Sequence, residues 1–293
     1  MSSFKKATRT RAKARVGIVG PAGAGKTYSA LQMAFGMGGK IAVIDTEHGS
    51  ADLYATLGEY DVAPITPPFT VQKYLNLIKE AEKEYDIIII DSLSHAWAGT
   101  GGLLEEVDKR AGSGNKFAAW RDVTPMHNSL IDAILQSPAH IIATMRSKTE
   151  YVIEENDKGK KVPRKIGMAP VQREGMDFEF TLVFDVEQSR HFATASKDRT
   201  SLFDGTCEKI SRESGERLKE WLESGDEPTV QKITREQQKQ IVAAMDGKVP
   251  PAGLYQRFNI TSSGELTYAQ FDEVLAWVAD MKLAKQQDGG SAE

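Results

Sequence analysis

Residues 20–27 read GPAGAGKT, and this stretch decides the fold because it lies between an apolar run at 16–19 and a helix-like stretch at 28–37. The order of strand, glycine-rich loop and helix is typical of a phosphate-binding loop, whose backbone N–H groups surround a polyphosphate. In such a loop Lys26 reaches the β- and γ-phosphates and the Thr27 hydroxyl ligates Mg²⁺. The sequence therefore predicts a nucleoside triphosphate site formed by Gly20, Pro21, Ala22, Gly23, Ala24, Gly25, Lys26, Thr27 and Tyr28.

The composition is that of an ordinary globular protein. The chain has 293 residues, 40% of them apolar, and a net charge of −4. A single cysteine, Cys207, excludes an intrachain disulfide, and neither a signal-peptide pattern nor an 18-residue apolar run occurs. We therefore expect a cytoplasmic protein without membrane association, with one large domain and one small one.

Apolar, strand-like runs alternate with longer amphipathic stretches. The runs lie at 16–19, 41–44, 87–90, 140–144, 181–186 and 191–195. This order predicts an α/β fold with a parallel-rich sheet that has helices on both faces. The last two runs are close together, so we expect them to add antiparallel pairs at the sheet edge.

A second nucleotide motif is the apolar run 87–90, which ends in Asp91 and is typical of a Walker B strand. Asp91 would hold Mg²⁺ through water. Many oligomeric ATPases carry a catalytic Glu directly after this Asp, but here the position is Ser92. The best candidate base is Glu47, which follows the neighbouring run at the same expected sheet edge and could orient an attacking water. The alternative is an exposed acid at a strand-to-loop junction.

At these residues the sequence resembles the RecA-type recombinase core, a P-loop NTPase fold. The stretch Ile44-Asp45-Thr46-Glu47-His48 matches the family's I-D-[AT]-E-H, in which the Glu acts on the hydrolytic water. The resemblance implies ATP as the nucleotide and adenine stacking on Tyr54. The Asp that recognises the base in RecA is displaced by one residue here, at Asp52. The alternative for Tyr54 is an ordinary half-buried aromatic.

Further roles follow from the same resemblance. Thr144 stands where RecA has a γ-phosphate-sensing Gln, although a Thr packed in a strand is an equal reading. Lys197 and Arg199 occupy a place where RecA-like filaments and ring helicases carry cations that reach a neighbouring subunit's nucleotide. This implies a homo-oligomer, a ring or a filament, with catalysis completed in trans. A charged hairpin turn is the alternative for this pair.

In the RecA core two mobile loops hold DNA, and both places look like loops here. The first, around 100–116, brings cations beside Phe117 and Trp120, and the second spans 147–170. The predicted contacts to single-stranded DNA are Lys109, Arg110, Lys116, Arg121, Lys148, Lys160, Lys161, Arg164 and Lys165. Acidic residues are interspersed in the second segment, so a solvated mixed-charge hairpin is the alternative.

The ends of the chain have a different character. We expect a basic tail at 1–15, an ATPase core at 16–222 and a linker at 223–232. A helical module at 233–285 and a disordered tail at 286–293 would follow. The basic tail could contact phosphates or remain solvated, and the module could pack or dock a partner.

Together these features resemble the short RecA-like proteins of bacteriophages that work in single-strand annealing recombination. The resemblance implies an ATPase that assembles on single-stranded DNA in the host cytoplasm, with a single-strand binding protein as a candidate partner. Two other classes stay open: a small-molecule P-loop kinase, and a nucleotide-gated assembly protein with little turnover.

Overall fold

The computed structural model describes residues 6–112, 114–155, 161–227, 232–246 and 249–288, with the backbone alone at 149–155, 161–167, 269 and 283–288. The chain divides into two compact units, Met1–Asp226 and Glu227–Glu293. Each unit has its own hydrophobic core, and the phosphate loop belongs to the larger one.

Within the described residues, a nine-stranded sheet forms the centre of the larger unit, in the order β3-β2-β4-β5-β1-β7-β8-β9 with β6 paired to β5. The strands are β1 (Arg15–Gly20), β2 (Ile41–Asp45), β3 (Asp61–Pro64), β4 (Ile87–Asp91), β5 (His140–Glu155), β6 (Lys161–Pro170), β7 (Leu182–Val186), β8 (Ala193–Asp198) and β9 (Cys207–Glu208). Strands β1 to β5 and β7 pair in parallel, whereas β6, β8 and β9 are antiparallel. The predicted α/β fold with a mostly parallel sheet is confirmed.

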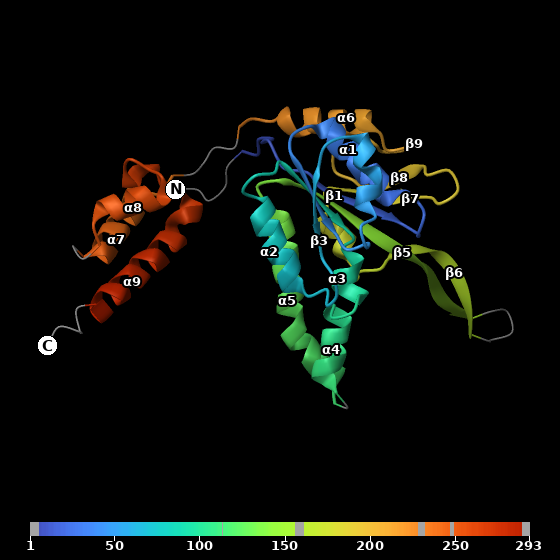
Figure 1. The fold of residues 1–293 in the computed structure, drawn as a ribbon, viewed down its shortest axis with the longest axis horizontal. Helices are drawn as coiled ribbons and strands as arrows, with labels where there is room; N and C mark the ends of the chain where they lie inside the picture. The colour runs from blue at the N-terminus through green and yellow to red at the C-terminus, as the bar shows by residue number, and fades with distance from the viewer. Residues whose placement is uncertain (1–5, 113, 156–160, 228–231, 247–248, 289–293) are drawn as a thin grey trace. The chain divides into compact units, whose positions relative to one another are not determined.

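Helices cover both faces of this sheet (Figure 1). One face carries α1 (Lys26–Met37) and α6 (Arg212–Glu223), and the other carries α2 (Val71–Ala81), α3 (Ser94–Ala98), α4 (Leu103–Ala111) and α5 (Lys116–Gln136). Successive strand side chains point to opposite faces. Accordingly, Ile87 and Ile89 of β4 join the core under α1 and α6, while Ile88 and Ile90 join the other core. This explains why the strand is apolar throughout.

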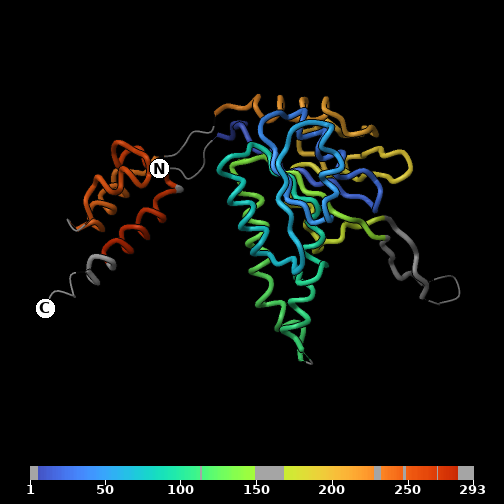
Figure 2. Tube along the Cα trace, in the orientation of Figure 1, coloured from blue at the N-terminus to red at the C-terminus, as the bar shows by residue number. Residues whose placement is uncertain are grey.

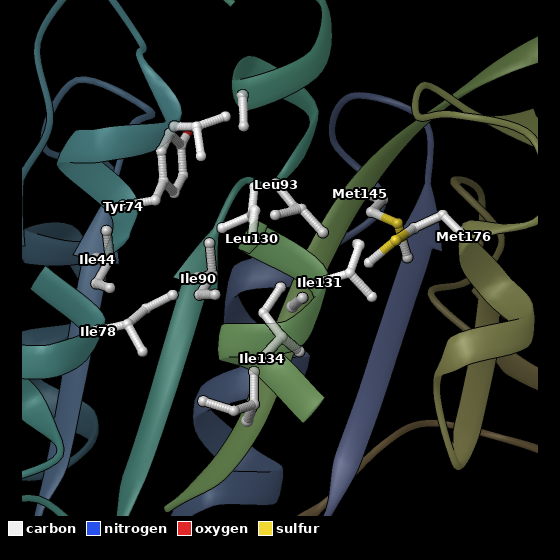
Figure 3. Close-up of a cluster of buried hydrophobic side chains, with 14 of the residues drawn as sticks. Ile44, Tyr74, Ile78, Ile90, Leu93, Leu130, Ile131, Ile134, Met145 and Met176 are labelled. Atoms are coloured by element: carbon white, nitrogen blue, oxygen red, sulfur yellow. The ribbon is translucent and has the colours of Figure 1, made fainter. Parts of the chain in front are cut away.

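The core under α2 and α5 is drawn in Figure 3. Tyr74 and Ile78 of α2 lie there with Ile134 of α5 and with Ile44 and Ile90 of the sheet. All five side chains are fully or almost fully buried. This packing fixes β2 and β4 side by side, and their last residues are therefore held at a common edge.

Helices α1 and α6 touch through two glycines. A Cβ on Gly36 would lie 1.8 Å from the Arg212 carbonyl oxygen, and one on Gly215 would lie 2.1 Å from the Met33 carbonyl oxygen. No other residue type fits such contacts, so these two positions set the distance between the helices.

The segment expected as a basic tail, 1–15, is partly built into the larger unit. Arg15 begins β1, is only 6% exposed and donates hydrogen bonds to carbonyl oxygens of Leu135, Ser137 and Ala139, at and just after the end of α5. Thr10 pairs with Asp226. Lys5 lies outside the described residues. A buried guanidinium that satisfies helix-end carbonyls is a structural residue, not a free cation.

The two segments expected as DNA-binding loops differ from that expectation. The first forms α4 and α5, which run side by side as a helical hairpin (Figure 2). The second, at 147–170, is an antiparallel hairpin in which β5 continues beyond the central sheet and pairs with β6. Both segments therefore consist of regular helices or strands and not of irregular loops.

The smaller unit contains α7 (Arg235–Met245), α8 (Pro251–Phe258) and α9 (Phe271–Asp288). Thr234 and Thr267 each form a capping box with the Gln three residues later. Helix α9 runs through part of the predicted disordered tail at 286–293, and 289–293 lie outside the described residues. In the described part of the chain, no helix combines the length and apolarity needed to cross a membrane.

Candidate nucleotide site

The phosphate loop leaves the end of β1 and turns directly into α1. Gly23 and Gly25 have φ values of 77° and 83°, a region that side chains with a Cβ rarely adopt. Gly25 is the N-cap of α1, so the first N–H groups of that helix face the loop. The Lys26 ammonium donates a 2.8 Å hydrogen bond to the Pro21 carbonyl. Burial lowers the pKa of Lys26, and the nearby Asp91 carboxylate opposes that shift.

Asp91 ends β4 beneath this loop and is 1% exposed. Its Oδ2 accepts a 2.6 Å hydrogen bond from the Thr27 hydroxyl, and its Oδ1 accepts one of 2.5 Å from the Thr144 hydroxyl. Burial raises the pKa of Asp91, and the two hydroxyl donors partly offset that shift. Thr144 is fully buried and uses its hydroxyl on Asp91, so here it supports the carboxylate and does not face the cavity.

The donor set fits Mg²⁺. The Thr27 hydroxyl and the Asp91 carboxylate supply hard oxygen ligands, and both residues line the cavity beside the phosphate loop. Mg²⁺ is commonly held by one or two protein oxygens together with substrate phosphates. Thr27 and Asp91, the two predicted metal ligands, are therefore brought together.

Glu47 follows β2 and lies at the same edge of the sheet. Its backbone N–H donates a 2.6 Å hydrogen bond to Asp45 Oδ1, which fixes the turn after the strand. Its carboxylate forms a two-point ion pair with Arg146, with 3.0 Å between Nε and Oε1 and a second contact from Nη2 to Oε2. Burial raises the pKa of Glu47, but hydrogen bonding and charge from Arg146 lower it further, so the net shift is downward. Sequence reasoning did not identify Arg146.

These side chains surround a cavity of about 210 Å³. Its lining is Ala22, Gly23, Gly25, Lys26, Thr27, Glu47, Ser50, Tyr54, Asp91 and Arg146. A second cavity of about 450 Å³ adjoins it and is lined by Gly23, Gly25, Tyr28, Ser29, Tyr54, His191, Lys209 and Ile210. The Tyr28 and Tyr54 rings meet edge to face with centroids 6.0 Å apart. The first cavity suits phosphates and the second has the size and apolar walls for a nucleoside.

The connection between β7 and β8 supports the phosphate loop from outside. Gln188 Nε2 donates a 2.8 Å hydrogen bond to the Ala22 carbonyl, and His191 Nδ1 lies 3.1 Å from the Ala24 carbonyl oxygen. No local sequence pattern could have identified them, because their role depends on a hairpin that folds back over the loop.

Asp52, the residue displaced from the family's base-recognising position, does not line either nucleotide cavity. It lines a separate cavity of about 640 Å³ next to β3, together with Glu59, Asp61 and Glu84. Asp52 and Tyr54 are therefore close in the sequence but line different cavities.

Lys197 and Arg199 are not brought to this chain's own phosphate loop. Lys197 pairs in register with Val183, and Asp198 pairs with Leu182, which itself lies opposite Val16 at the start of β1. The phosphate loop leaves the other end of β1, about 13 Å away along the strand. The Lys197 ammonium donates hydrogen bonds to the Asp177 and Phe178 carbonyls, and Arg199 is exposed.

The predicted DNA-binding cations of the first segment sit on the α4–α5 hairpin and have acidic partners. Lys109 pairs with Glu105, Arg110 with Glu106, and Lys116 with Asp108, at distances of 2.9, 2.7 and 2.7 Å. Arg121 lies 3.7 Å from Asp122. Such exposed pairs are screened by water and contribute little, so a phosphate could compete for these cations.

The second segment is described in part. Lys148 is exposed. It lines a cavity of about 530 Å³ together with Arg173. Lys161, Arg164 and Lys165 lie on β6, where only the backbone is described, and Lys160 lies outside the described residues.

A strand, a glycine-rich loop and a helix that hold Lys26 and Thr27 beside a buried Asp91 define a P-loop nucleotide-binding protein. More specifically, the chain matches the AAA domain family over residues 12–210 and belongs to that family. Domains of this P-loop type bind nucleotides, typically with Mg²⁺, which makes ATPase activity the expected chemistry. A search of proteins with curated functions gave no match.

Proposed function

We propose that the protein is a RecA-type ATPase that binds single-stranded DNA and hydrolyses ATP with Mg²⁺. The observation that carries this proposal is the position of Glu47. It stands at the end of β2, next to β4 with Asp91, and shares one cavity with Lys26 and Thr27. A carboxylate on the strand beside the Walker B strand replaces the missing acid at Ser92.

The residues divide the work of hydrolysis between them. The N–H groups of the phosphate loop and Lys26 hold the β- and γ-phosphates. Thr27 and Asp91 would hold Mg²⁺, which neutralises charge on the phosphates during transfer. Glu47 orients the attacking water and accepts its proton. Tyr54 and Tyr28 form a wall for the nucleoside, with ATP as the proposed nucleotide.

Single-stranded DNA is the proposed partner of the two hairpins. The α4–α5 hairpin carries Lys109, Arg110, Lys116 and Arg121, and Phe117 at its tip is 85% exposed. Exposed aromatics among cations suit a strand whose bases can stack and whose phosphates can pair with Lys and Arg. Lys148 and the cations of β6 extend the same chemistry to the second hairpin.

A homo-oligomer completes the proposed site. Lys197 and Arg199 are too far from their own phosphate loop, but they could reach the loop of a second copy. Exposed apolar side chains lie on both surfaces: Phe178 is 68% exposed beside Lys197, and Leu53 is 80% exposed near the nucleotide cavity. Joining one surface to the other is a head-to-tail contact, which gives a ring or a filament.

The resemblance to short phage RecA-like proteins supports a role in single-strand annealing recombination, in the host cytoplasm. The smaller unit is the proposed contact for a further partner such as a single-strand binding protein. Its Val242 and Tyr268 are each 61% exposed.

The decisive test is steady-state ATP hydrolysis by the wild type and by Glu47→Gln, with and without single-stranded DNA, at two salt concentrations. We expect DNA to stimulate hydrolysis, salt to suppress the stimulation, and the substitution to lower turnover by at least about 10²-fold. Turnover that ignores DNA, or phosphate transfer to a small molecule, would point to a P-loop kinase. Negligible turnover in both proteins would point to a nucleotide-gated assembly protein.

A further inference from the structure

Arg146 stands at the junction between the nucleotide site and the β5–β6 hairpin. It is the last residue of β5 that pairs with β1, opposite Gly20. The next residue, Ser147, is the first to pair with β6, opposite Pro170. The Arg146 backbone is anchored on both sides, because its N–H donates to Ser94 Oγ at 2.9 Å and its carbonyl accepts from Val171 N–H at 2.6 Å.

The side chain of Arg146 points into the phosphate cavity, where it meets Glu47 and shares the lining with Lys26. Two guanidinium nitrogens contact the two oxygens of the Glu47 carboxylate. The Arg146 side chain is 45% exposed and that of Glu47 is 21% exposed. The pair is therefore reachable by a ligand that enters the cavity.

In this arrangement Glu47 is poorly suited to act as a base. Both carboxylate oxygens accept from Arg146, which occupies one lone pair on each and leaves the carboxylate fewer positions from which to hold a water. Hydrogen bonding to a cation also makes a carboxylate a weaker proton acceptor. Release of Arg146 would correct both defects.

A triphosphate is a strong competitor for Arg146. The cavity holds two cations, Lys26 and Arg146, and two acids, Glu47 and Asp91. The terminal phosphate carries more charge than one carboxylate and accepts a guanidinium in the same two-point geometry. A diphosphate lacks that terminal group.

We propose that Arg146 exchanges partners when a nucleoside triphosphate binds: its guanidinium leaves Glu47 for the terminal phosphate, and Glu47 becomes free to hold the attacking water. This inference rests on the proposed ATPase function and adds a phosphate-contacting residue to it.

The test is a double-mutant cycle on nucleotide affinity, which does not require hydrolysis. Binding of ADP and of a non-hydrolysable ATP analogue, both with Mg²⁺, is measured for the wild type, Arg146→Gln, Glu47→Gln and the double variant. We expect Arg146→Gln to weaken the triphosphate about tenfold while changing ADP little. Glu47→Gln should tighten the triphosphate severalfold, because Arg146 no longer has a competing partner, and most of this gain should vanish in the double variant.

Arg146→Lys and Arg217→Gln provide controls. Lysine keeps the charge but not the two-point contact, so it should retain part of the preference for triphosphate. It also serves if Arg146→Gln does not fold. Arg217→Gln removes an ion pair with Glu208 and should leave the ratio of the two affinities unchanged.

Two results would overturn the exchange: equal weakening of ADP and triphosphate by Arg146→Gln, or an undiminished gain from Glu47→Gln in the Arg146→Gln background. Either result with a wild type that binds and hydrolyses ATP leaves the proposed function standing. A wild type that does not bind the triphosphate refutes both.

Discussion

The Thr27 hydroxyl donates a 2.6 Å hydrogen bond to the Asp91 carboxylate, although the two residues lie 64 positions apart in the chain. The contact joins the first turn of α1 to the end of β4, and so connects the phosphate loop with the Walker B strand. The hydroxyl thus has a structural role, and the proposed site gives it a second role as a ligand of Mg²⁺.

Thr27→Ala should therefore impair both stability and activity. The substitution leaves a buried carboxylate with one donor fewer, which costs about 1–3 kcal/mol of unfolding free energy. Loss of a ligand for the metal should lower ATP hydrolysis on the order of 10²-fold. Thr27→Ser keeps the hydroxyl and should stay close to the wild type in both urea unfolding and a Mg²⁺ titration of hydrolysis. Equal defects in the two variants would refute the role of the hydroxyl.

Mixing two inactive variants tests the trans role of Arg199. Lys26→Ala has a defective phosphate loop and an intact Arg199, while Arg199→Ala has the reverse. In a random equimolar oligomer about a quarter of the head-to-tail contacts combine an intact loop with an intact Arg199, so about a quarter of the wild-type activity should return. Each variant alone should stay inactive. If the mixture also stays inactive, Arg199 does not act across the subunit contact.

Gly36→Ala should destabilise the larger unit. Its Cβ would lie 1.8 Å from the Arg212 carbonyl oxygen, so α1 and α6 must move apart, at a cost on the order of 2–3 kcal/mol. Gly253→Ala on α8 is the matched control, because its nearest contact is Trp277 at 3.6 Å. That substitution should be neutral or slightly stabilising, since alanine is the better helix former. Calorimetric unfolding of both variants would show a loss in the first case alone.

The stability of the larger unit should fall in mild acid because of His140. Burial, with positive charge from Lys13 and Arg15 as a smaller cause, lowers the pKa of His140 to about 4. In the unfolded chain His140 is protonated below about pH 6.5, whereas in the folded chain it stays neutral down to about pH 4. The contribution of neutral His140 to the free energy of unfolding is therefore complete above pH 6.5. It is lost as the pH falls from 6.5 towards 4, and the loss is about 2 kcal/mol at pH 5.

His140→Asn checks this assignment. The side-chain oxygen of asparagine can still accept the hydrogen bond that Ala14 N–H donates to His140 Nδ1 at 3.0 Å. Urea unfolding of the variant should therefore lose less stability between pH 7 and pH 5 than the wild type. His95 and His127 also have pKa values lowered by burial, so part of the acid dependence should remain. An identical loss in both proteins would assign the effect to those other groups.

The parts of the site that could be predicted from the sequence are those with local patterns. The phosphate loop, the strand ending in Asp91 and the position of Glu47 each depend on a few consecutive residues, and parallel strands bring their ends to one edge. The pairing of Arg146 with Glu47 could not be predicted, because the two residues are 99 positions apart and belong to strands that are not neighbours.

The fold shows the same division. The buried runs of β1, β2 and β4 were recognisable because they are apolar throughout, whereas β3 has no fully buried residue and β6 carries three cations among its ten residues. The turn around Gly112 and Gly114 suggested a loop, but it joins two helices, and the Asn115 side chain caps the second by accepting from Phe117 N–H. A glycine-rich turn between two helices is easily taken for a long loop when few apolar residues at helical spacing lie next to it.

Strand β5 runs from the nucleotide site into the hairpin as one strand, so a rotation near the site would displace the far end of the hairpin by a larger distance. The nine residues from Ser147 to Glu155 span about 30 Å at the rise of an extended strand. A pivot of about 5° at Arg146 would then displace the far end of the arm by roughly 3 Å. By the same ratio, a small displacement at Arg146 would correspond to a displacement several times larger at Glu155 if the hairpin turned as a rigid body.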